Sequence, residues 1–397
     1  MKCLLITSYF PPVIGGSATV YGNIHKYGQP HVFVLTARRD RETGAPIKRS
    51  GDDHTILETE YIQPPAKRSR SLLQSALILL TNDLPVHIKL ACRCIRIIRK
   101  MNIGVVCLGE IQALGWLGSL LKLFSKAKVV YYAHGEELTT RQTSRFIGRQ
   151  TEKHLRQADG IICVSSYTRS VLANQYNILS HKLKLITNGI DINKPRAQTS
   201  PTINNKGIVL FSAGRLIDRK GFDFAIKAMR LVLPRHPDTS LLIAGDGPNI
   251  QKYSKLISEL NLQSNVTLLG RVSDDELTTL YQQCDIFIMP NRELDNGDTE
   301  GFGLVFLEAN LFKKPVIGGR AGGASDAIVH KKTGLLVDST TPKAIAEAIE
   351  RLIEDKKLRQ DLGTNGYRWA LENNVKNKVN AFIAYCNTLC EETNNNA

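Results

Sequence analysis

The amino-acid sequence predicts an α/β protein made of two doubly wound domains in tandem. Short apolar runs that are typical of buried strands alternate with helical segments, which is the pattern of parallel β-α-β units. The chain has 397 residues, which is enough for two or three domains of ordinary size. A stretch rich in Pro, Asn, Ser and Thr, residues 191–205, interrupts the pattern halfway and is the expected linker.

The expected strands form two series, one on each side of this linker. The series in the N-terminal domain, residues 1–195, consists of Lys2–Ser8, His31–Thr36, Ile103–Leu108, Lys128–Ala133, Gly160–Val164 and Lys184–Thr187. The series in the C-terminal domain, residues 196–375, consists of Gly207–Ala213, Ser240–Ala244, Asn265–Leu269, Asp285–Met289 and Pro315–Gly318. Helices are expected over Phe224–Leu233, Pro342–Glu354 and Gly366–Glu392. Ligands of such sheets bind at the carboxyl ends of the strands, so function is expected in the loops that follow them.

Composition indicates a soluble or surface-bound protein of the cytoplasm. The first residues lack the apolar core of a secretory signal, and the most apolar run, Leu72–Leu80, is less than half of a membrane span. The eight cysteines form no CxxC pair and no zinc-site spacing with histidine, so we expect them to be reduced and mostly buried.

All of the excess positive charge lies in the first half of the chain. Residues 1–200 contain 28 Lys and Arg against 13 Asp and Glu, whereas residues 201–397 contain 24 of each kind. This asymmetry indicates an anionic partner of the N-terminal domain: a membrane, an acceptor molecule or a nucleic acid. The sequence has no recognition motif and no basic groove studded with aromatic residues, which argues against a nucleic-acid-binding protein.

A basic amphipathic helix is expected over Val86–Lys100. Its apolar stripe would contain Ile88, Ala91, Cys92, Ile95 and Ile98. The helix could pack beside the Ile103–Leu108 strand and expose its basic face to solvent. Alternatively, it could lie on an anionic lipid surface together with the basic run at residues 67–70.

Two loops of the N-terminal domain are candidates for ligand contact. The loop after the first strand carries Gly15 and Gly16 ahead of a helix, where backbone N–H groups can approach an anion closely. The alternative is a tight turn without a ligand. His134 follows the Lys128–Ala133 strand beside a glycine, a position suited to contact with a substrate, although a lone histidine is more often structural.

In the C-terminal domain, the loop after the Gly207–Ala213 strand carries two cations. Arg215 offers a planar fork for phosphate and Lys220 a compact charge, so together they could hold a diphosphate. The alternative is a solvent-exposed basic loop that binds no ligand. Gly245 begins the turn after the next strand, and its residue types suit an architectural role as well as they suit ligand contact.

The segment from Glu300 to Ala309 carries two carboxylates eight positions apart. Gly301 and Gly303 suggest that Glu300 lies in a loop and that a helix begins after it, which would place Glu308 one to two turns inside that helix. Both could accept hydrogen bonds from sugar hydroxyls, one set on a transferred sugar and one on a ribose. The alternative is a capped helix start with a surface glutamate. A glycine-rich loop follows at residues 318–323, where successive N–H groups could hold phosphate oxygens.

In this order, the motifs of the C-terminal domain resemble those of the retaining GT-B glycosyltransferases known as family four. The resemblance covers residues 205–340 and rests on GRLxxxKG, GDGP, EGFGLVxLEA, PVIGGxAGG and TGLLV. The N-terminal domain matches more loosely, through PPxxGGS, HGEE, SSYTR and NGID. This family implies a GT-B fold, with two Rossmann-like domains facing each other across a cleft and a C-terminal helix, residues 376–397, that crosses back to the N-terminal domain.

The resemblance also implies roles for the candidate residues. Arg215 and Lys220 would bind the donor diphosphate and stabilise the leaving group. Glu300 and His134 would contact the transferred sugar, and Glu308 would contact the ribose. The implied catalytic residues are thus Arg215, Lys220, Glu300 and His134. The implied donor-binding positions are Gly15, Gly16, Gly245, Gly303, Leu304, Val305, Glu308, Gly319 and Gly322.

The implied activity is a retaining, metal-independent hexosyltransferase without a cofactor. The donor would be a nucleotide-diphosphate sugar and the acceptor a glycan or a lipid-linked precursor of the cell envelope. The glycine-rich loop is similar to that of mannosyltransferases that use GDP-mannose, while UDP-sugar-dependent glucosyl or N-acetylglucosaminyl transfer stays open. A GT-B epimerase or phosphorylase is a further alternative, and the ordered set of cations and carboxylates argues against it.

Overall fold

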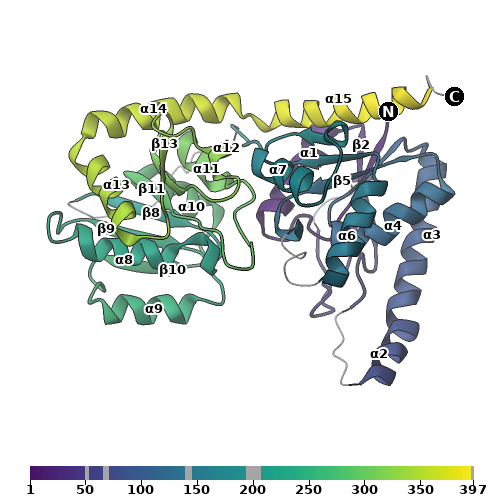
Figure 1. Ribbon diagram of the computed structural model, residues 1–397, viewed down its shortest axis with the longest axis horizontal. Helices are drawn as coiled ribbons and strands as arrows, with labels where there is room; N and C mark the ends of the chain where they lie inside the picture. Colours follow the sequence, from purple (N-terminus) through teal and green to yellow (C-terminus); the bar gives the residue numbers. More distant parts are fainter. Residues whose placement is uncertain (50–52, 66–70, 139–144, 194–206, 395–397) are drawn as a thin grey trace. The chain divides into compact units, whose positions relative to one another are not determined.

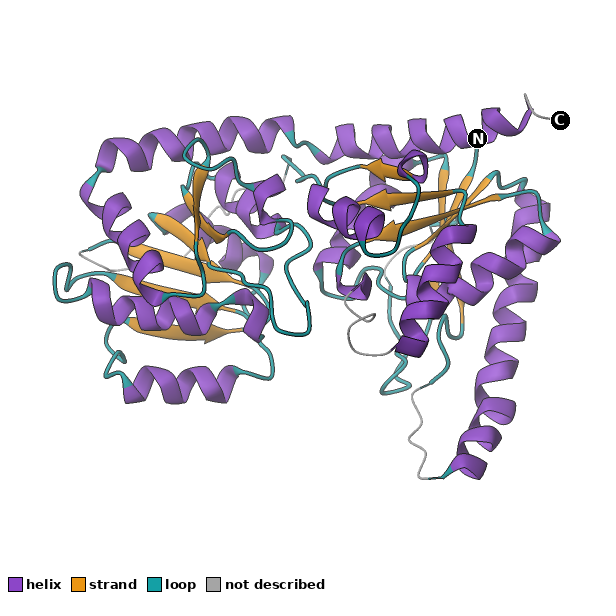
Figure 2. Cartoon of the chain, in the orientation of Figure 1, coloured by secondary structure: helices purple, strands orange, loops and turns teal. Residues whose placement is uncertain are grey.

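The chain folds into two compact units. The computed structural model describes residues 1–49, 53–65, 71–138, 145–193 and 207–394, and the expected linker lies largely outside them. Unit 1 contains Met1–Val164, Thr168–Ile186 and the chain from Lys376 onward. Unit 2 contains Ser165–Tyr167 and Thr187–Val375. Each unit is built on a parallel sheet with helices packed against it, so the predicted α/β class with two Rossmann-like domains is confirmed (Figures 1 and 2).

The sheet of unit 1 has seven parallel strands in the order β3-β2-β1-β4-β5-β6-β7. The strands are β1 Cys3–Ile6, β2 Val32–Ala37, β3 Ile56–Thr59, β4 Val105–Leu108, β5 Lys128–Ala133, β6 Gly160–Cys163 and β7 Leu183–Leu185. The central strands are buried on both faces, which explains their continuous apolar sequences. The strand order reverses between β1 and β4, so the carboxyl ends of these two strands flank the crevice where such sheets bind ligands.

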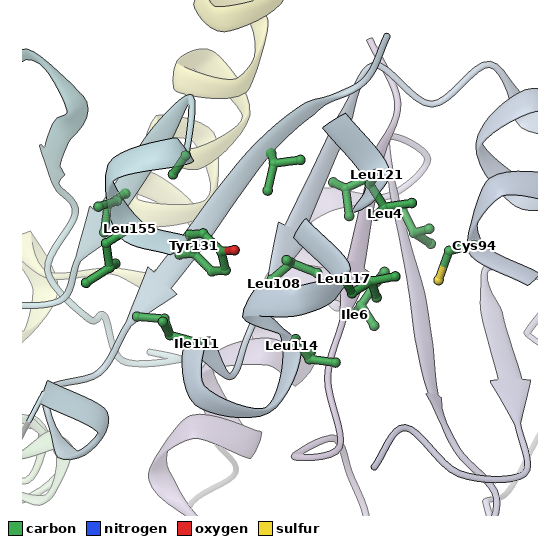
Figure 3. Packing of buried hydrophobic residues seen from close by; sticks show 14 of the residues in the cluster. Leu4, Ile6, Cys94, Leu108, Ile111, Leu114, Leu117, Leu121, Tyr131 and Leu155 are labelled. Atoms are coloured by element: carbon green, nitrogen blue, oxygen red, sulfur yellow. The ribbon is translucent and has the colours of Figure 1, made fainter. Parts of the chain in front are cut away.

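Helical segments lie between and after the strands of unit 1. The helices are α1 Gly16–Gly28, α2 Leu72–Ile78, the π-helix η1 Leu79–Asp83, α3 Leu84–Met101, α4 Ile111–Phe124, η2 Glu136–Leu138, α6 Arg145–Gln157, α7 Ser166–Asn174, η3 Ser180–Lys182 and α15 Val375–Asn394. Leu114, Leu117 and Leu121 share one face of α4 and pack in the core with Leu4 and Leu108 (Figure 3). Burial of each such side chain stabilises the fold by roughly 2 kcal/mol.

The segment α2-η1-α3 carries a face that the rest of unit 1 does not cover. Helix α3 buries Leu90, Ala91, Cys94 and Ile98, whereas Ile88 and Cys92 are exposed. The expected apolar stripe was therefore wrong in these two members, because the buried face includes Leu90 and Cys94 and is rotated around the helix from the expected one. The basic run expected to join this surface, residues 67–70, lies outside the described residues. Within the described part of the chain, no helix is long and apolar enough to cross a membrane.

The sheet of unit 2 has six parallel strands in the order β10-β9-β8-β11-β12-β13. The strands are β8 Val209–Ala213, β9 Ser240–Ala244, β10 Val266–Gly270, β11 Ile286–Met289, β12 Val316–Gly319 and β13 Gly334–Val337. The helices are η4 Asp218–Lys220, α8 Phe222–Val232, α9 Ile250–Glu259, α10 Asp274–Gln283, α11 Leu304–Leu311, α12 Ala324–Ala327, α13 Pro342–Glu354 and α14 Lys356–Glu372. The order reverses between β8 and β11, and the loops after these strands therefore meet at the crevice.

The helix expected over Gly366–Glu392 is interrupted. Helix α14 ends at Glu372 and α15 begins at Val375. The NGID segment is hydrogen-bonded to the chain at this break. The N–H of Ile190 donates to the carbonyl of Asn373 at 2.9 Å, and the N–H of Val375 donates to the carbonyl of Ile190 at 2.9 Å. This pairing takes peptide groups that a continuous helix would have used itself.

Candidate active site

Glu300 is the centre of a buried charged cluster in unit 2. Its Oε2 accepts a hydrogen bond from Arg219 Nη1 at 2.7 Å and from Lys220 Nζ at 2.6 Å. Only 8% of the residue is exposed. Burial raises the pKa of Glu300, but the charges of Lys220 and Arg219 outweigh it and hold the pKa below its ordinary value. Glu300 is therefore an ionised carboxylate held in place by two cations.

The loop after β8 delivers the two cations. Residues Asp218–Lys220 form the short helix η4, and Gly221 follows it in the left-handed region at φ 74°. A Cβ atom at Gly221 would lie 1.9 Å from the carbonyl oxygen of Pro290, so only glycine lets this loop pack against the loop after β11. That approach brings Lys220 to Glu300.

Sequence reasoning nominated Arg215 with Lys220, and the structure joins only one of them to Glu300. Arg215 lies exposed on the same loop and, within the described chain, makes no contact with Glu300. Arg219 is the second cation, and it also lies 3.5 Å from Asp298. Arg219 could not be predicted, because the sequence gives no sign of which basic residues of a loop point inward.

Glu308 lies where the sequence predicted, in the second turn of helix α11. The helix begins after Gly303, which has φ 90° and no room for a side chain, since a Cβ would lie 2.6 Å from the ring of Phe306. Leu304 and Val305 form the first turn, whose N–H groups have no carbonyl partner earlier in the helix. The carboxylate of Glu308 accepts a hydrogen bond from the hydroxyl of Tyr281 at 2.9 Å.

The glycine-rich loop after β12 supports Glu300 directly. Gly323 N–H donates to the carbonyl of Glu300 at 2.7 Å, and a Cβ at Gly322, which has φ 64°, would lie 2.3 Å from the same oxygen. The buried side chain of Asn291 accepts from Gly319 N–H at 3.1 Å and donates to the carbonyl of Ala321 at 2.9 Å. The N–H groups of Gly319 and Gly323 are thus engaged within the protein, which leaves fewer groups for phosphate than the sequence suggested.

Gly245 has an architectural reason to be glycine. It has φ 140°, and a Cβ there would lie 1.9 Å from the carbonyl oxygen of Gly214. The turn after β9 is hydrogen-bonded to the loop after β8, because Leu216 N–H donates to the carbonyl of Asp246 at 2.9 Å. Donor contact at Gly245 stays a prediction.

In unit 1, His134 lies at the carboxyl end of β5 in a fixed protonation state. Burial lowers the pKa of His134 to about 4, so the imidazole is neutral near pH 7. Its Nε2 lies 2.9 Å from the hydroxyl of Tyr21, which donates to the carbonyl of Gly109 at 2.8 Å. Because the phenol has one proton to give, Nε2 must donate to Tyr21, and Nδ1 is left as a hydrogen-bond acceptor.

The loop that carries Gly15 and Gly16 is held from both sides by ionisable side chains. Glu110 accepts from the hydroxyl of Thr7 at 2.6 Å and from the N–H of Ser8 at 3.1 Å. Burial raises the pKa of Glu110 to about 7, although these hydrogen bonds lower it. On the other side, Arg49 donates to the carbonyl of Pro11 at 2.9 Å. Neither Glu110 nor Arg49 was predicted from the sequence as a site residue.

Gly15 and Gly16 differ from Gly221, Gly245 and Gly322 of unit 2. A Cβ atom at either position would meet no atom of the described chain within 4 Å. Packing inside the protein therefore does not require glycine there, and open space remains beside the first turn of α1. Among the described residues, no group of three or more His, Cys, Asp or Glu side chains could hold a metal ion.

The family comparisons agree with this geometry. Residues 193–369 match the model of the Glycosyl transferases group 1, and residues 30–194 match that of Glycosyltransferase Family 4. The chain is 29% identical over 385 residues to the GDP-mannose-dependent alpha-(1-6)-phosphatidylinositol monomannoside mannosyltransferase of Mycolicibacterium smegmatis, covering 93% of this chain and 94% of the relative. The protein of the same name from Mycobacterium tuberculosis is 31% identical over 288 residues, covering 69% and 73%.

Solved structures are similar in fold over nearly the whole chain. Sucrose-phosphate synthase from Thermosynechococcus elongatus has a TM-score of 0.77 at 20% identity, with 98% of each chain covered. Anabaena Alr3699/HepE in complex with UDP has a TM-score of 0.74 at 21% identity, with 98% of this chain and 100% of that chain covered. Together, the family matches and the two parallel sheets show that the chain belongs to glycosyltransferase family four, a family of retaining hexosyltransferases with the GT-B fold.

Proposed function

We propose that this enzyme transfers a hexose, with mannose as the leading candidate, from a nucleotide-diphosphate sugar to a lipid-linked or polysaccharide-precursor acceptor of the cell envelope. The observation that carries the proposal is the ionised Glu300 beside Lys220 and Arg219 at the carboxyl edge of a parallel sheet. A fixed anion can accept hydrogen bonds from sugar hydroxyls, while fixed cations stabilise the charge of a departing diphosphate.

In this mechanism the cations perform the main catalytic task. The bond between the anomeric carbon and the diphosphate oxygen breaks as the acceptor oxygen bonds to the same face of the sugar, which retains the configuration. The proton of the acceptor hydroxyl passes to the departing diphosphate oxygen. Negative charge grows on the diphosphate in the transition state, and Lys220 and Arg215 are the groups proposed to meet it. Lys220 is already held in place by Glu300, so little reorganisation is needed when the charge develops.

The charge state of Glu300 argues against a role as acid. Glycosidases that use a general acid raise the pKa of a carboxyl group, and here neighbouring cations lower it. The same cations draw electron density from the carboxylate and make it a weak nucleophile. We therefore assign Glu300 to the hydroxyls of the transferred sugar, and Glu308 to the ribose.

Two features of unit 1 fit contact with substrate. Gly15 and Gly16 border open space at a helix N-terminus, where a phosphate or an acceptor could approach the backbone. The acceptor nitrogen of the neutral His134 could receive a hydrogen bond from a sugar hydroxyl.

Mannose and GDP are favoured by the relatives, which are named as GDP-mannose-dependent mannosyltransferases and which match this chain over most of their length. A UDP-sugar is the alternative donor, and one experiment distinguishes the two donors. The protein is incubated with GDP-mannose or UDP-glucose, and thermal stabilisation and release of nucleoside diphosphate are measured. Stabilisation and release with GDP-mannose support the proposal, whereas a response to UDP-glucose alone would replace the donor, and no response to any sugar nucleotide would remove the function.

We further propose that the enzyme works on an anionic membrane surface through the segment α2-η1-α3. Leu77, Leu79 and Leu80 are exposed there, and the exposed face continues along α3 through Leu84 and Ile88. Beyond Ile88 the exposed residues of α3 include four basic ones, Lys89, Arg96, Arg99 and Lys100, and three of these lie toward the end of the helix. An apolar end that enters the acyl region beside a basic end that meets lipid phosphates is the arrangement of an interfacial helix.

This surface fits a lipid-linked acceptor, and the relatives act on a phosphatidylinositol mannoside according to their names. Sedimentation with vesicles tests it. The protein is expected to bind vesicles that contain anionic lipid and to remain in solution with neutral ones. Equal binding to both kinds of vesicle would contradict the proposal.

A further inference from the structure

Glu308, the proposed ribose-binding residue, is connected to a tyrosine that no part of the proposed mechanism uses. Tyr281 lies near the end of α10, and its hydroxyl donates to Oε2 of Glu308 at 2.9 Å. Glu308 itself is only half-buried, so a ligand can reach it. A glutamate side chain has three rotatable bonds, and a ligand that must order it loses binding free energy.

The ring of Tyr281 is fixed on several sides. Only 2% of the residue is exposed. Its ring is stacked on Phe312, with 5.9 Å between centroids and an interplanar angle of 7°, and it makes an edge contact with Phe211 at 5.2 Å. Phe211 belongs to β8, the strand whose loop delivers Lys220. The phenol hydroxyl is therefore placed by the sheet itself.

The hydroxyl remains a proton donor at any pH at which the enzyme works. Burial, followed by the nearby charge of Glu308, raises the pKa of Tyr281 well above its usual value. Of the two partners, the carboxylate must accept and the phenol must donate, so the bond restrains Oε2 of Glu308 at a defined position.

We infer that Tyr281 is a positioning residue for nucleotide recognition: it holds the carboxylate of Glu308 in the orientation that receives the ribose hydroxyls of a nucleoside diphosphate. This inference rests on the proposed function, which assigns Glu308 to the ribose. The simpler possibility is that the bond only ties α10 to α11 and adds stability to unit 2. The two differ in one respect, because only a positioning role depends on the hydroxyls of the ligand.

A ligand that lacks these hydroxyls separates the two possibilities. The affinity of the full-length protein for GDP and for UDP is measured by calorimetry, and the tighter ligand is compared with its 2′,3′-dideoxy analogue. Tyr281→Phe removes one oxygen and keeps the aromatic stack. This variant should bind the ribose ligand about five-fold more weakly, as expected for one hydrogen bond of ordinary net strength, and should bind the dideoxy ligand as the wild type does.

Two further variants keep the result interpretable. Glu308→Gln should also lose affinity for the ribose ligand alone, and adding Tyr281→Phe to it should have little further effect, because the two side chains act as one unit. Tyr131→Phe is the matched control, since it removes a buried hydroxyl that donates to the carbonyl of Gly115 in unit 1. Its affinity for both ligands should equal that of the wild type.

Equal weakening of both ligands by Tyr281→Phe, or no weakening of either, would overturn the inference. If Glu308→Gln weakens binding of the ribose ligand and not of the dideoxy ligand, the proposed role of Glu308 survives that result. If Glu308→Gln changes the affinities for the two ligands equally, the assignment of Glu308 to the ribose fails as well. Binding of neither diphosphate by the wild type would remove both the proposed function and this inference.

Discussion

At the scale of single residues, the buried carboxyl group of Glu300 and the half-buried one of Glu110 are held in different ionisation states by their neighbours. At Glu300 the penalty of burial is outweighed by Lys220 and Arg219, so the pKa is lowered. At Glu110 only neutral donors such as Thr7 offset burial, and the pKa is raised to about 7. Neutral hydrogen-bond donors compensate a buried charge less than cations do, and this difference explains the two outcomes.

The partnership of Arg219 with Glu300 predicts a shift in the pH dependence of catalysis. Arg219→Gln removes one cation, so the pKa of Glu300 should rise and the carboxylate should become protonated at a higher pH. Sugar transfer should fall, and the acidic limb of the kcat/KM profile should move to higher pH relative to the wild type. Profiles measured between about pH 4 and pH 8 check this, and an unchanged acidic limb would show that Glu300 does not titrate with activity.

Glu110 predicts a dependence of stability on pH. Its folded pKa of about 7 lies above its ordinary value of 4.5, so its contribution to stability is fully present below pH 4.5 and is lost as the pH rises to about 7. The loss is at most about 3 kcal/mol. Glu110→Gln has no carboxyl group to ionise, so the variant should gain stability relative to the wild type between these pH values. Denaturant unfolding at pH 4.5, 6 and 8 measures the difference, and a difference that is constant with pH would contradict the assignment.

At the scale of elements, glycines of similar sequence context have different reasons to be glycine. Gly322 lies in the left-handed region and packs against the backbone of Glu300, whereas a Cβ at Gly16, the first residue of α1, would meet no described atom within 4 Å. The sequence predicted that both lie in loops after strands. It could not predict which loop packs against another, because that depends on backbone distances between residues far apart in the chain.

This contrast predicts opposite effects of two alanine substitutions. Gly322→Ala should destabilise unit 2 by about 1 kcal/mol or more, because its Cβ would overlap the carbonyl of Glu300 at a strained φ. Gly16→Ala should leave stability unchanged or slightly higher while transfer activity falls. Thermal unfolding and initial rates of transfer measured on both variants check this, and full activity of Gly16→Ala would place the substrate elsewhere.

The exposed face of α2-η1-α3 predicts an effect on membrane binding without an effect on folding. Replacement of both Leu79 and Leu80, which are 53% and 61% exposed, by serine should reduce sedimentation with anionic vesicles several-fold and leave thermal stability unchanged. Leu123→Ser is the control, because Leu123 is 76% exposed on α4, outside this segment. Equal loss from the control variant would show that the effect is not specific to the segment.

At the scale of the whole molecule, the sequence predicted both sheets and most of their strands. Strand β3 was missed because its residues are only half-buried at the sheet edge, and Gly334–Val337 was noted as a motif without being predicted as the strand β13. The chain positions of Glu300, Lys220 and Glu308 could also be predicted, since each lies in a loop after a strand or in the helix that follows such a loop. Arg219, Tyr281 and Asn291 could not, because their roles depend on side-chain direction and burial, which a single sequence does not encode in its spacing.

The central claim is that the buried carboxylate of Glu300 serves sugar transfer in unit 2, and Glu300→Gln tests it most directly. The variant keeps the shape of the side chain and removes its charge, and circular dichroism verifies that it is folded. Binding of the sugar-nucleotide donor should stay within a few-fold of the wild type, while the rate of transfer to acceptor should fall by about a hundred-fold or more, as when one preorganised group of an active site is lost. Turnover equal to that of the wild type would contradict the account.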